Sequence, residues 1–388
     1  MAKYVLLVGA KSNAGDFLIV DRAKKLLRTH NPQTEFLELP RWEPITDSLE
    51  QVNNSHAVIL CGGPAYQPHF YPGIYPLVED LDRIKVPIIP FGLGWKGFPG
   101  DEACLRSYSF TPSSLRLLRK IHEEARWTSC RDYLTKRVLA RQGFTNVIMT
   151  GDPAWYDLAY IGKSFVPPRD IRTIVFSVPA RGIYHRQSIE LARGVRGLFP
   201  GAELLCTFHH GWEASSHVSP HVAATFSQLR EAFDRCGFKT ISLVGDLQRM
   251  ESMYGDAELH IGYRLHAHLF FLSQRKVSFL MEEEGRGRGA SEALGLRGIQ
   301  AWSRRAALSV ITKTPDIRFV RGILHRLLGH EVTSRETAAN EMLSIIAEEL
   351  EDGFPRFKGL GERLDYYYAK MMLPFLNSLP RGIPADEK

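Results

Sequence analysis

The sequence predicts an α/β protein built from two Rossmann-like domains, each a doubly wound parallel sheet, followed by a helical C-terminal segment. Short apolar runs alternate with helical patterns along most of the 388 residues, which is typical of parallel sheets. The alternation stops at the proline-containing stretch Gly162 to Asp170 and then starts again. A chain of this length is also too long to fold around one small hydrophobic core. We therefore expect domains at residues 1–165 and 170–314, and a helical segment at 315–388 that packs back on the first domain.

Composition and charge narrow the function classes. Hydrophobic residues make up 44% and charged residues 24% of the chain, the balance of an ordinary globular protein. The net charge of +6 is spread singly, without a zinc finger, an aromatic-basic repeat or a long basic block, which argues against nucleic acid as a partner. An anionic small substrate or an anionic membrane surface would account for this charge equally well.

The cysteines and the amino terminus bear on the compartment. The five cysteines are odd in number, far apart and without a CxxC pair, so we expect free thiols in a reducing compartment and no metal site. The apolar run in MAKYVLLVGAKSN is too short for a signal peptide or a membrane span. We therefore expect a cytoplasmic protein, with a peripheral membrane contact as the weaker alternative.

Six strands are expected in the first half of the chain. The apolar runs are Tyr4–Val8, Phe36–Leu39, Ala57–Cys61, Val86–Phe91, a run ending at Cys130, and Val147–Thr150. Helical periodicity follows near Phe17, at Ser113–Glu124 and at Tyr133–Gln142. Because parallel strands collect their carboxyl ends at one edge, the glycine-rich and charged strand ends should lie together there.

Two loops of this half have the character of a binding site. The first, AKSNAGD, holds Asn13 and Asp16 at the start of a helix, and its glycine permits close backbone approach. From the residues alone, Asp16 is expected to cap the helix, with a contact to a sugar hydroxyl as the alternative. The second loop begins with Gly62 and Gly63, which leave room for a ligand against bare backbone. The first loop is not GxGxxG, so a dinucleotide site is not expected.

The same alternation fills the second half. Strands are expected at Thr173–Val178, Glu203–Phe208 and Thr240–Val244, and helices at Gln187–Leu198, Val222–Cys236 and Leu247–Tyr254. Two such sheets with a cleft between their facing strand ends form the GT-B arrangement. Arg181, His209 and His210 lie at strand ends of this half. Adjacent histidines point to opposite sides of a strand, so we expect one of them to face the cleft and no two-histidine metal site.

The stretch Leu259 to Ala290 carries the strongest candidates. A short strand leads directly into a helix, and Arg264 and His266 lie at this junction. The start of a helix favours an anion, so a cation and an imidazole there indicate an anion pocket with a proton donor. The next strand should be followed by a flexible loop, EEEGRGRGAS, which carries Arg286 and Arg288. The alternative is structural: the arginine pairs with a core carboxylate and the histidine caps a turn.

Several of these stretches resemble the polysaccharide pyruvyl transferases, in order and in spacing. SNAGD is similar to that family's Asn-x-Gly-Asp loop, and CGGP and FGLG occupy the places of its glycine runs. SCRDYLTKRVLARQGF followed by TGDPAW looks like its Arg-Asp helix and Asp-Pro element. The most specific stretch is GYRLHAHLFFLSQRKVSFLMEEEGRGRGASEALGL, which resembles its Arg-Leu-His signature and the elements after it. Together they span Gly9 to Leu296.

The resemblance implies transfer of a pyruvyl group from phosphoenolpyruvate onto two hydroxyls of one sugar, with release of phosphate. Arg264, Arg131 and one of Arg286 or Arg288 would hold the donor, since guanidinium groups bind phosphate and carboxylate bidentately. The family usually has a lysine where these last two arginines stand. His266 would supply the proton. Further substrate-binding candidates are Leu265, Asn13, Asp16, Gly62, Gly63, Arg181 and His209.

The implied partners are phosphoenolpyruvate and a sugar or glycan acceptor, and no cofactor or metal is needed. The first domain would take the acceptor and the second the donor. A lipid-linked, a nucleotide-linked and a polymeric acceptor all remain open. Two other functions share the fold: a GT-B glycosyltransferase or nucleotide-sugar epimerase, which would bind a nucleotide diphosphate, and a glycan-binding relative without catalysis.

Overall fold

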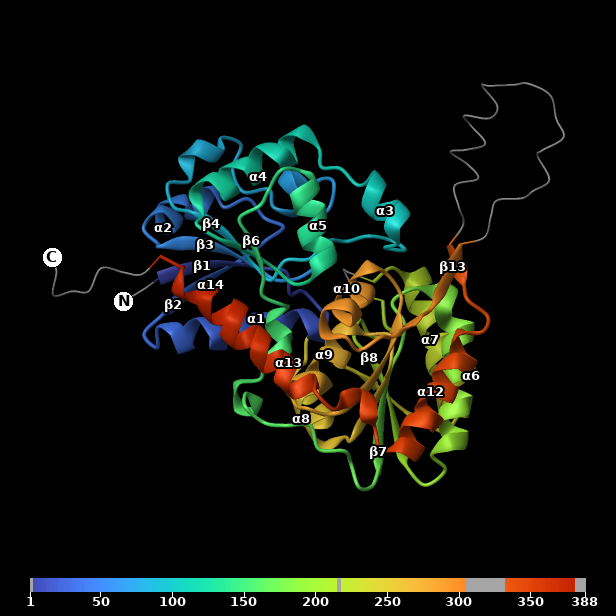
Figure 1. Ribbon diagram of the computed structural model, residues 1–388. Coiled ribbons are helices and arrows are strands. Elements are labelled where there is room, and N and C mark those ends of the chain that lie inside the picture. Colours follow the sequence, from blue (N-terminus) through green and yellow to red (C-terminus); the bar gives the residue numbers. More distant parts are fainter. Residues whose placement is uncertain (1–2, 215–217, 305–331, 381–388) are drawn as a thin grey trace, which may run out of the picture.

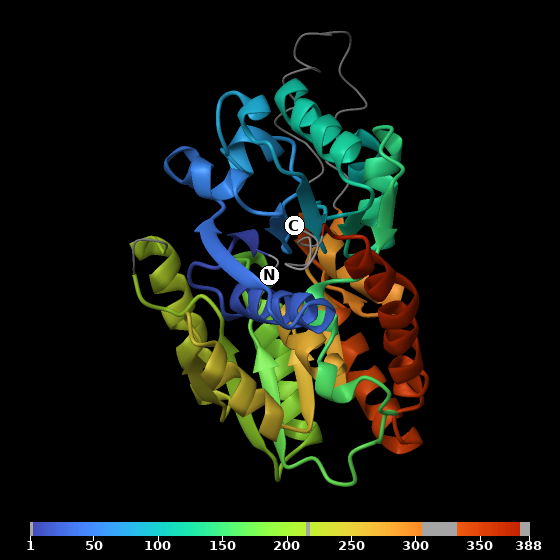
Figure 2. The same cartoon turned by 90° about the vertical axis from the view of Figure 1, so that its left-hand side faces the viewer.

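The computed structural model describes residues 3–214, 218–304 and 332–380, and it contains two α/β domains lying against each other (Figure 1). Turned by 90°, the two domains stand one above the other, with helix α1 at their boundary (Figure 2). Of the expected helical segment 315–388, residues 315–331 and 381–388 lie outside the described residues.

The first domain is organised around parallel strands. Their bounds are β1 Lys3–Val8, β2 Glu35–Pro40, β3 Ala57–Cys61, β4 Ile88–Phe91, β5 Thr128–Cys130 and β6 Val147–Met149. Four of them form one sheet in the order β2-β1-β3-β4, whereas β5 and β6 form a separate pair. We expected a single six-stranded sheet. The pair is linked to the larger sheet by a single bridge between Leu93, which follows β4, and Cys130 of β5.

The helices of the first domain follow the expected alternation. They are α1 Ala14–His30, α2 Leu49–Asn53, α3 Glu102–Ser107, α4 Pro112–Glu124 and α5 Tyr133–Arg141. Helix α1 buries Leu18, Ala23 and Leu26 against its own sheet. It also contacts α8 and α9 of the second domain, so it brings the loop after β1 to the domain boundary.

The second domain has a six-stranded parallel sheet in the order β12-β11-β10-β7-β8-β9. The strands are β7 Thr173–Ser177, β8 Glu203–Phe208, β9 Lys239–Ser242, β10 Leu259–Gly262, β11 Val277–Glu282 and β12 Ile299–Gln300. Numbered from β7, this order is the 3-2-1-4-5-6 order of the Rossmann fold. The order reverses between the neighbours β7 and β10, and ligands bind in the crevice at such a point.

The helices of the second domain are α6 His185–Leu198, α7 Pro220–Arg235, α8 Leu247–Asp256, α9 Leu265–Ser273 and α10 Gly285–Leu294. Every residue of α9 is buried, so this helix lies in the interior beneath the domain boundary. The prediction of a flexible loop after β11 is wrong, because residues 285–294 form α10. Its glycines permit close contact: a Cβ on Gly289 would lie 2.6 Å from the carboxyl carbon of Asp132 at the start of α5.

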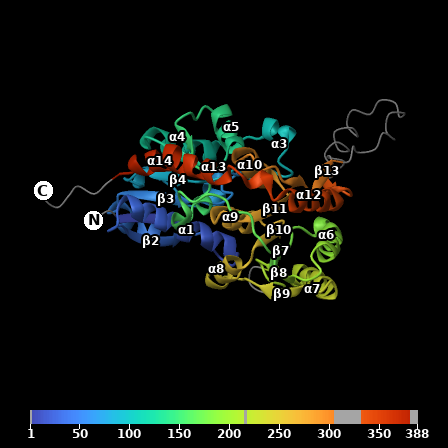
Figure 3. The ribbon, with the colours of Figure 1, turned by 60° about the horizontal axis from the view of Figure 1, so that its bottom comes forward.

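The C-terminal part returns across both domains. It contains β13 Trp302–Arg304, β14 Val332–Ser334, α12 Ala338–Asp352, α13 Leu360–Tyr367 and α14 Leu373–Asn377. Helix α12 packs on α6 of the second domain, where Leu343 covers Gly194, and not on the first domain as we expected (Figure 3). Helix α14 reaches the first domain, where Phe375 lies 5.4 Å from the ring of Phe91. None of the helices in the described ranges is long and apolar enough to cross a membrane.

Candidate active site

A cavity lies at the domain boundary, at the carboxyl ends of the strands. Its walls come from the loop after β1, the end of β8, the turn from β10 to α9 and the turn from β11 to α10. The lining residues are Asn13, His209, Tyr263, Arg264, Leu265, His266, Leu280, Met281, Glu283, Glu284, Arg286 and Gly287. The first domain therefore contributes Asn13, and the switch point of the second sheet provides the rest.

Three helices begin at this cavity. Asn13, Arg264 and Glu284 are the residues that precede the first turns of α1, α9 and α10. The side chain of Asn13 accepts a hydrogen bond from the Gly15 amide, whereas α9 and α10 have no side-chain cap. The uncapped first turn of α9 and the positive ends of three helix dipoles therefore face one small volume, which favours a bound anion.

Arg264 is the cation at the centre of this volume. Its side chain is buried, and its Nε and Nη2 atoms have no hydrogen-bond partner among the described residues. Burial lowers its pKa, and the negative charge of Glu283 opposes that shift. A buried guanidinium with unused donors is costly unless an anion completes it.

His266 lies between the two domains. Its Nε2 atom is 3.6 Å from Oδ2 of Asp152 in the first domain, and neither atom has a hydrogen-bond partner among the described residues. Gly15 makes this position accessible, because a Cβ there would lie 2.7 Å from Nδ1 of His266. The imidazole and its carboxylate are thus brought together only when both domains are in place.

Asp152 and Arg131 lie behind His266, outside the lining of the cavity. Burial alone would raise the pKa of Asp152, yet its contact with His266 and the charge of Arg131 hold that pKa below the ordinary value. Arg131 lies 4.0 Å from Asp152 and 3.3 Å from Asp132, and it donates to the Trp95 carbonyl. Arg131 does not line the cavity, so in this structure it acts on Asp152 more directly than on a ligand.

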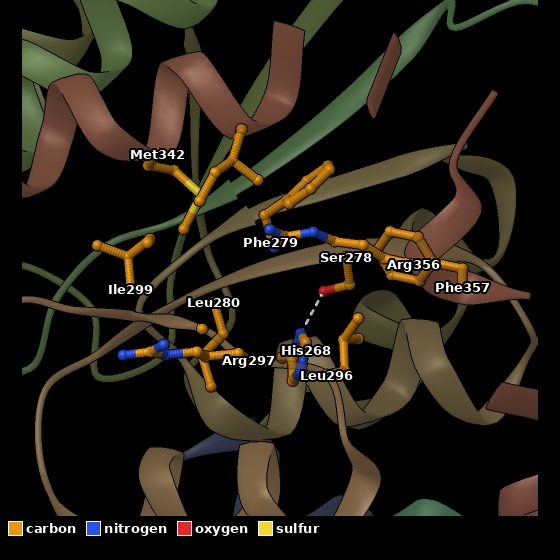
Figure 4. Close-up of a pocket in the computed structure, with 12 residues that line it drawn as sticks. His268, Ser278, Phe279, Leu280, Leu296, Arg297, Ile299, Met342, Arg356 and Phe357 are labelled. Atoms are coloured by element: carbon orange, nitrogen blue, oxygen red, sulfur yellow. Dashed lines mark hydrogen bonds between the residues drawn. The ribbon is translucent and has the colours of Figure 1, made fainter. Parts of the chain in front are cut away.

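A buried hydrogen-bond chain holds the start of α9. Ser177 at the end of β7 accepts a hydrogen bond from the Arg264 amide at 3.0 Å, and its hydroxyl lies 2.8 Å from Nε2 of His260. The other nitrogen of His260 contacts the Ser278 hydroxyl at 2.8 Å, which also contacts His268 at 2.7 Å. Figure 4 shows His268 and Ser278 facing each other beside a second, separate small cavity. This chain fixes the backbone that carries Arg264.

The two arginines of α10 have different surroundings. Arg286 lines the cavity, and its Nε donates to Glu284. Arg288 points away from it and pairs with Glu102 of the first domain at 3.1 Å and with Glu292 at 2.8 Å. Of the two candidates for the position of the family lysine, Arg286 is therefore the one placed at the cavity.

Two acids follow β11 at the wall of the cavity. The Glu283 side chain accepts hydrogen bonds from the amides of Ala180 and Arg181, at 3.0 and 3.3 Å. Burial raises the pKa of Glu283 to about 7, against the opposing charge of Arg264. Glu284 behaves oppositely, because the charges of Arg286 and Arg181 outweigh the effect of burial and lower its pKa. Glu283 therefore has a pKa near neutral pH, and the neighbouring Glu284 is a carboxylate that stays ionised.

Arg181 lies outside the cavity. Its guanidinium is 3.5 Å from Glu284 and 3.8 Å from the centre of the Phe98 ring, so it joins a first-domain loop to the wall of the site. Of the adjacent histidines, His209 lines the cavity and His210 does not. The charge of Arg264 and burial lower the pKa of His210 to about 3.

The candidate residues in the two loops of the first domain have different roles in the structure. Asn13 is the helix cap, so the prediction that Asp16 caps α1 is wrong; Asp16 lies in the first turn instead. Burial raises the pKa of Asp16, opposed by the charges of His266 and Arg41. Gly62 has a positive φ of 56°, and a Cβ at this position would lie 2.1 Å from Cγ2 of Ile19 in α1. Its role in this structure is therefore packing. A Cβ on Gly63 would lie 3.3 Å from Arg41.

Sequence reasoning missed several residues of this site. Asp152 belongs to the Asp-Pro element of TGDPAW but is not among the predicted site residues, although an acid directly after a buried strand lies at the same edge as the other strand ends. Glu283 was read as part of a charged loop. Arg41, which follows β2, and Tyr263 gave no signal in the sequence. Among the described residues, no group of three or more histidine, cysteine or acidic side chains is arranged to hold a metal ion.

Solved structures resemble the whole chain at low identity. The UDP co-structure of MnaA from Staphylococcus aureus has a TM-score of 0.50 and 12% identity, covering 95% of this chain and 92% of that one. A putative UDP-N-acetylglucosamine 2-epimerase from Listeria monocytogenes scores 0.48 with 12% identity over 98% and 93%, and Anabaena HepE with UDP and glucose scores 0.48 with 11% over 97% and 98%. The likeness to MnaA concerns the fold, which is of the GT-B type: two Rossmann-like domains whose strand ends face each other.

Sequence comparison identifies the family. No curated protein matches the chain significantly. The family model of the polysaccharide pyruvyl transferases, in contrast, matches residues 13–284, which include Asn13, Arg264, His266 and Glu284 of the cavity. Because these residues make up more than half of the 388-residue chain, the protein belongs to the polysaccharide pyruvyl transferase family.

Proposed function

We propose that the protein transfers a pyruvyl group from phosphoenolpyruvate onto two hydroxyls of a sugar, in a glycan or a glycan precursor, with release of phosphate. The observation that carries this proposal is Arg264, a buried guanidinium with two nitrogen atoms that have no partner among the described residues. It precedes α9 and lines the same cavity as His266. A small ester with two anionic groups meets the needs of such a site.

The donor would be held by charge and by helix amides. The guanidinium groups of Arg264 and Arg286 can bind the phosphate and the carboxylate, and the uncapped amides at the start of α9 supply further donors. Arg286 is already paired with Glu284, which keeps its guanidinium oriented at the wall. Preorganised cations of this kind also stabilise the phosphate as it leaves.

His266 would protonate the methylene carbon of the donor. Protonation turns the neighbouring carbon into an oxocarbenium-like centre, which a sugar hydroxyl can attack. The carboxylate of Asp152 at 3.6 Å is placed to stabilise the imidazolium form and to orient the ring. Asp152 is fully buried and its pKa is lowered, so it carries its charge at neutral pH.

The acceptor would approach from the side of the first domain, where Asn13 and Asp16 lie. A lipid-linked, nucleotide-linked or polymeric sugar would all present the two neighbouring hydroxyls that the reaction needs. A cytoplasmic location with a transient membrane contact remains our prediction for such an acceptor.

Binding of the donor is tested by thermal shift, with phosphoenolpyruvate against UDP-N-acetylglucosamine as the nucleotide-sugar probe. Phosphoenolpyruvate at about 100 times its Kd should stabilise the protein by roughly 2.7 kcal/mol. Arg264→Ala and Arg286→Ala should remove most of this gain. Arg186→Ala is the control, since it removes the same charge from an exposed position on α6, away from the cavity and from the domain boundary. Stabilisation by the nucleotide sugar alone would support an epimerase or glycosyltransferase instead.

Proton transfer is tested in D2O, where reversible protonation of the donor introduces deuterium at its methylene carbon. His266→Gln should abolish this exchange, and Asp152→Asn should slow it by roughly 10²-fold. Asp132→Asn is the matched control, because that buried carboxylate also pairs with Arg131 but does not contact His266. Equal exchange in all variants would exclude His266 as the proton donor, whereas binding without exchange would favour a glycan-binding relative without catalysis.

A further inference from the structure

The cavity holds a second histidine with a defined hydrogen-bond partner. His209, at the end of β8, lines the same cavity as Arg264 and His266, and its side chain is buried. Its Nε2 atom lies 2.8 Å from the hydroxyl of Tyr254 on α8. None of the described residues makes a hydrogen bond to its other ring nitrogen, Nδ1. The chemistry of that free nitrogen depends on where the ring proton is.

The partners of Tyr254 fix the position of this proton. The Thr207 hydroxyl lies 3.3 Å from the Phe176 carbonyl, which can only accept, so Thr207 donates to it. Thr207 must then accept at 2.9 Å from the Tyr254 hydroxyl, which in turn must accept from Nε2–H of His209. The chain runs in one direction from His209 to a main-chain carbonyl. It leaves Nδ1 as an unprotonated lone pair.

The surroundings keep this ring neutral. Burial lowers the pKa of His209 well below its ordinary value, and the charge of Arg264 adds to the effect, followed by those of His210, His266 and His260. Burial likewise raises the pKa of Tyr254, so its hydroxyl keeps the proton that it donates. A donor molecule that brings negative charge to Arg264 would offset the second of these causes. The ring would then accept a proton more readily once the donor is bound.

The two imidazoles of the cavity thus have opposite environments. His266 faces the buried carboxylate of Asp152, whereas His209 faces a cation and donates its only proton to a tyrosine. Environments of opposite sign separate an acid from a base in one site. We propose that His209 is the general base that removes the proton from the attacking sugar hydroxyl.

This role rests on the proposed function and completes its proton balance. His266 gives a proton to the methylene carbon of phosphoenolpyruvate, and the hydroxyl oxygen bonds to the adjacent carbon as its own proton passes to Nδ1 of His209. The bond from that carbon to the phosphate oxygen breaks, and a second hydroxyl closes the ketal. Of the two protons lost by the hydroxyls, one replaces the proton given to carbon and the other leaves with phosphate.

His260 illustrates why burial alone does not make a base. It is also fully buried, and its pKa is likewise lowered by burial. Both of its ring nitrogens, however, are engaged by the hydroxyls of Ser177 and Ser278. It therefore has no lone pair to offer and lies outside the cavity.

The ring proton is tested first without any substrate. In protein labelled with ¹⁵N-histidine, the His209 signals are assigned by their loss in His209→Gln. We expect a neutral ring protonated at Nε2 near pH 7. Thr207→Val keeps the shape of the side chain but removes the hydroxyl that sets the direction, so protonation at Nδ1 should appear. A wild-type ring protonated at Nδ1 would overturn the assignment.

The catalytic role is tested with phosphoenolpyruvate in D2O as the only substrate, with water as the attacking hydroxyl. His209→Gln should keep deuterium exchange at the methylene carbon within about threefold but lower phosphate release by roughly 10² to 10⁴-fold. Tyr254→Phe should lower it less. His122→Gln is the control, because His122 is also a histidine whose pKa is lowered by burial but it contacts Asn146 outside the cavity.

The outcomes separate the two proposals. Exchange with unchanged phosphate release in His209→Gln would overturn the base. Loss of exchange and release together in that variant would also overturn it and make His209 part of the donor site. Absence of both in the wild-type protein would overturn the proposed function itself.

Discussion

At the scale of single residues, the cavity contains an acid whose charge depends on pH within the neutral range. Burial raises the pKa of Glu283 to about 7 from the 4.5 of an exposed glutamate. The folded state therefore binds more protons than the unfolded state between these two values. The contribution of Glu283 to stability is complete below about pH 4.5 and is lost as the pH rises through 7.

Glu283→Gln removes this dependence. The variant should gain stability relative to the wild type between pH 5 and 9, by at most about 3 kcal/mol, as measured by denaturant unfolding of the ligand-free protein. Glu284→Gln is the matched control with the opposite sign: the pKa of Glu284 is lowered, mainly by Arg286 against burial, so this variant should lose stability as the pH rises. Parallel curves for the two variants would contradict the assignment.

The sequence predicted the residues of the second-domain wall better than their partners. Arg264, Leu265 and His266 follow a buried strand, and such a position is readable because the strand period and the helix start coincide. Asp152 comes from the other domain, more than a hundred residues away in the sequence. No local sequence pattern predicts that it lies next to His266. Contacts between domains are set by packing, which a single sequence does not display.

At the scale of elements, most strands and helices followed from hydrophobic periodicity. The clear failure is α10, whose sequence GRGRGASEAL looks like a flexible loop because glycine lowers helix propensity. Tertiary contact outweighs that cost. The glycines let the helix lie against the first domain, where a Cβ on Gly100 would stand 2.1 Å from the Cα of Gly285.

This close approach can be separated from backbone strain. Gly100 has φ +88° and Gly143 has φ +90°, but a Cβ on Gly143 would have nothing within 4 Å. Both alanine variants should lose roughly 1 kcal/mol from the left-handed backbone. Only Gly100→Ala should lose more, and only it should weaken phosphoenolpyruvate binding, because α10 must move. Equal thermal and binding changes in the two variants would mean that the contact with Gly285 is not tight.

At the scale of the whole molecule, the site exists only where two sheets meet. Asn13 and Asp152 come from the first domain, and Arg264, His266 and Arg286 from the second. The loop before α3 and the first residue of that helix make contacts across the boundary: Asp101 pairs with Arg304, and Glu102 pairs with Arg288. The Gly97 carbonyl on the same loop accepts a hydrogen bond from the Gly285 amide. These contacts join the two domains at this boundary.

The ion pairs of this boundary are partly exposed, so each contributes only about 0–1 kcal/mol and is weakened by salt. That is little against the free energy of unfolding, but it matters for an equilibrium between open and closed domains, where 1.4 kcal/mol is a factor of about ten. The variant Asp101→Asn with Glu102→Gln should therefore raise the Kd for phosphoenolpyruvate roughly 3- to 10-fold at low salt, since less of the protein is competent to bind. Near 1 M salt, where screening is almost complete, it should match the wild type. Small-angle scattering of the ligand-free variant should show a larger radius of gyration at low salt.

Glu190→Gln is the control for this experiment, because it breaks an exposed ion pair with Arg186 inside α6, away from the boundary. It should change neither the Kd nor the radius of gyration. If the double variant binds phosphoenolpyruvate as the wild type does at low salt, the two pairs do not hold the domains together. A loss of binding that persists in high salt would instead assign the effect to the helix cap that Asp101 provides for α3, through its hydrogen bond from the Cys104 amide. The salt dependence therefore distinguishes closure of the molecule from local damage to one helix.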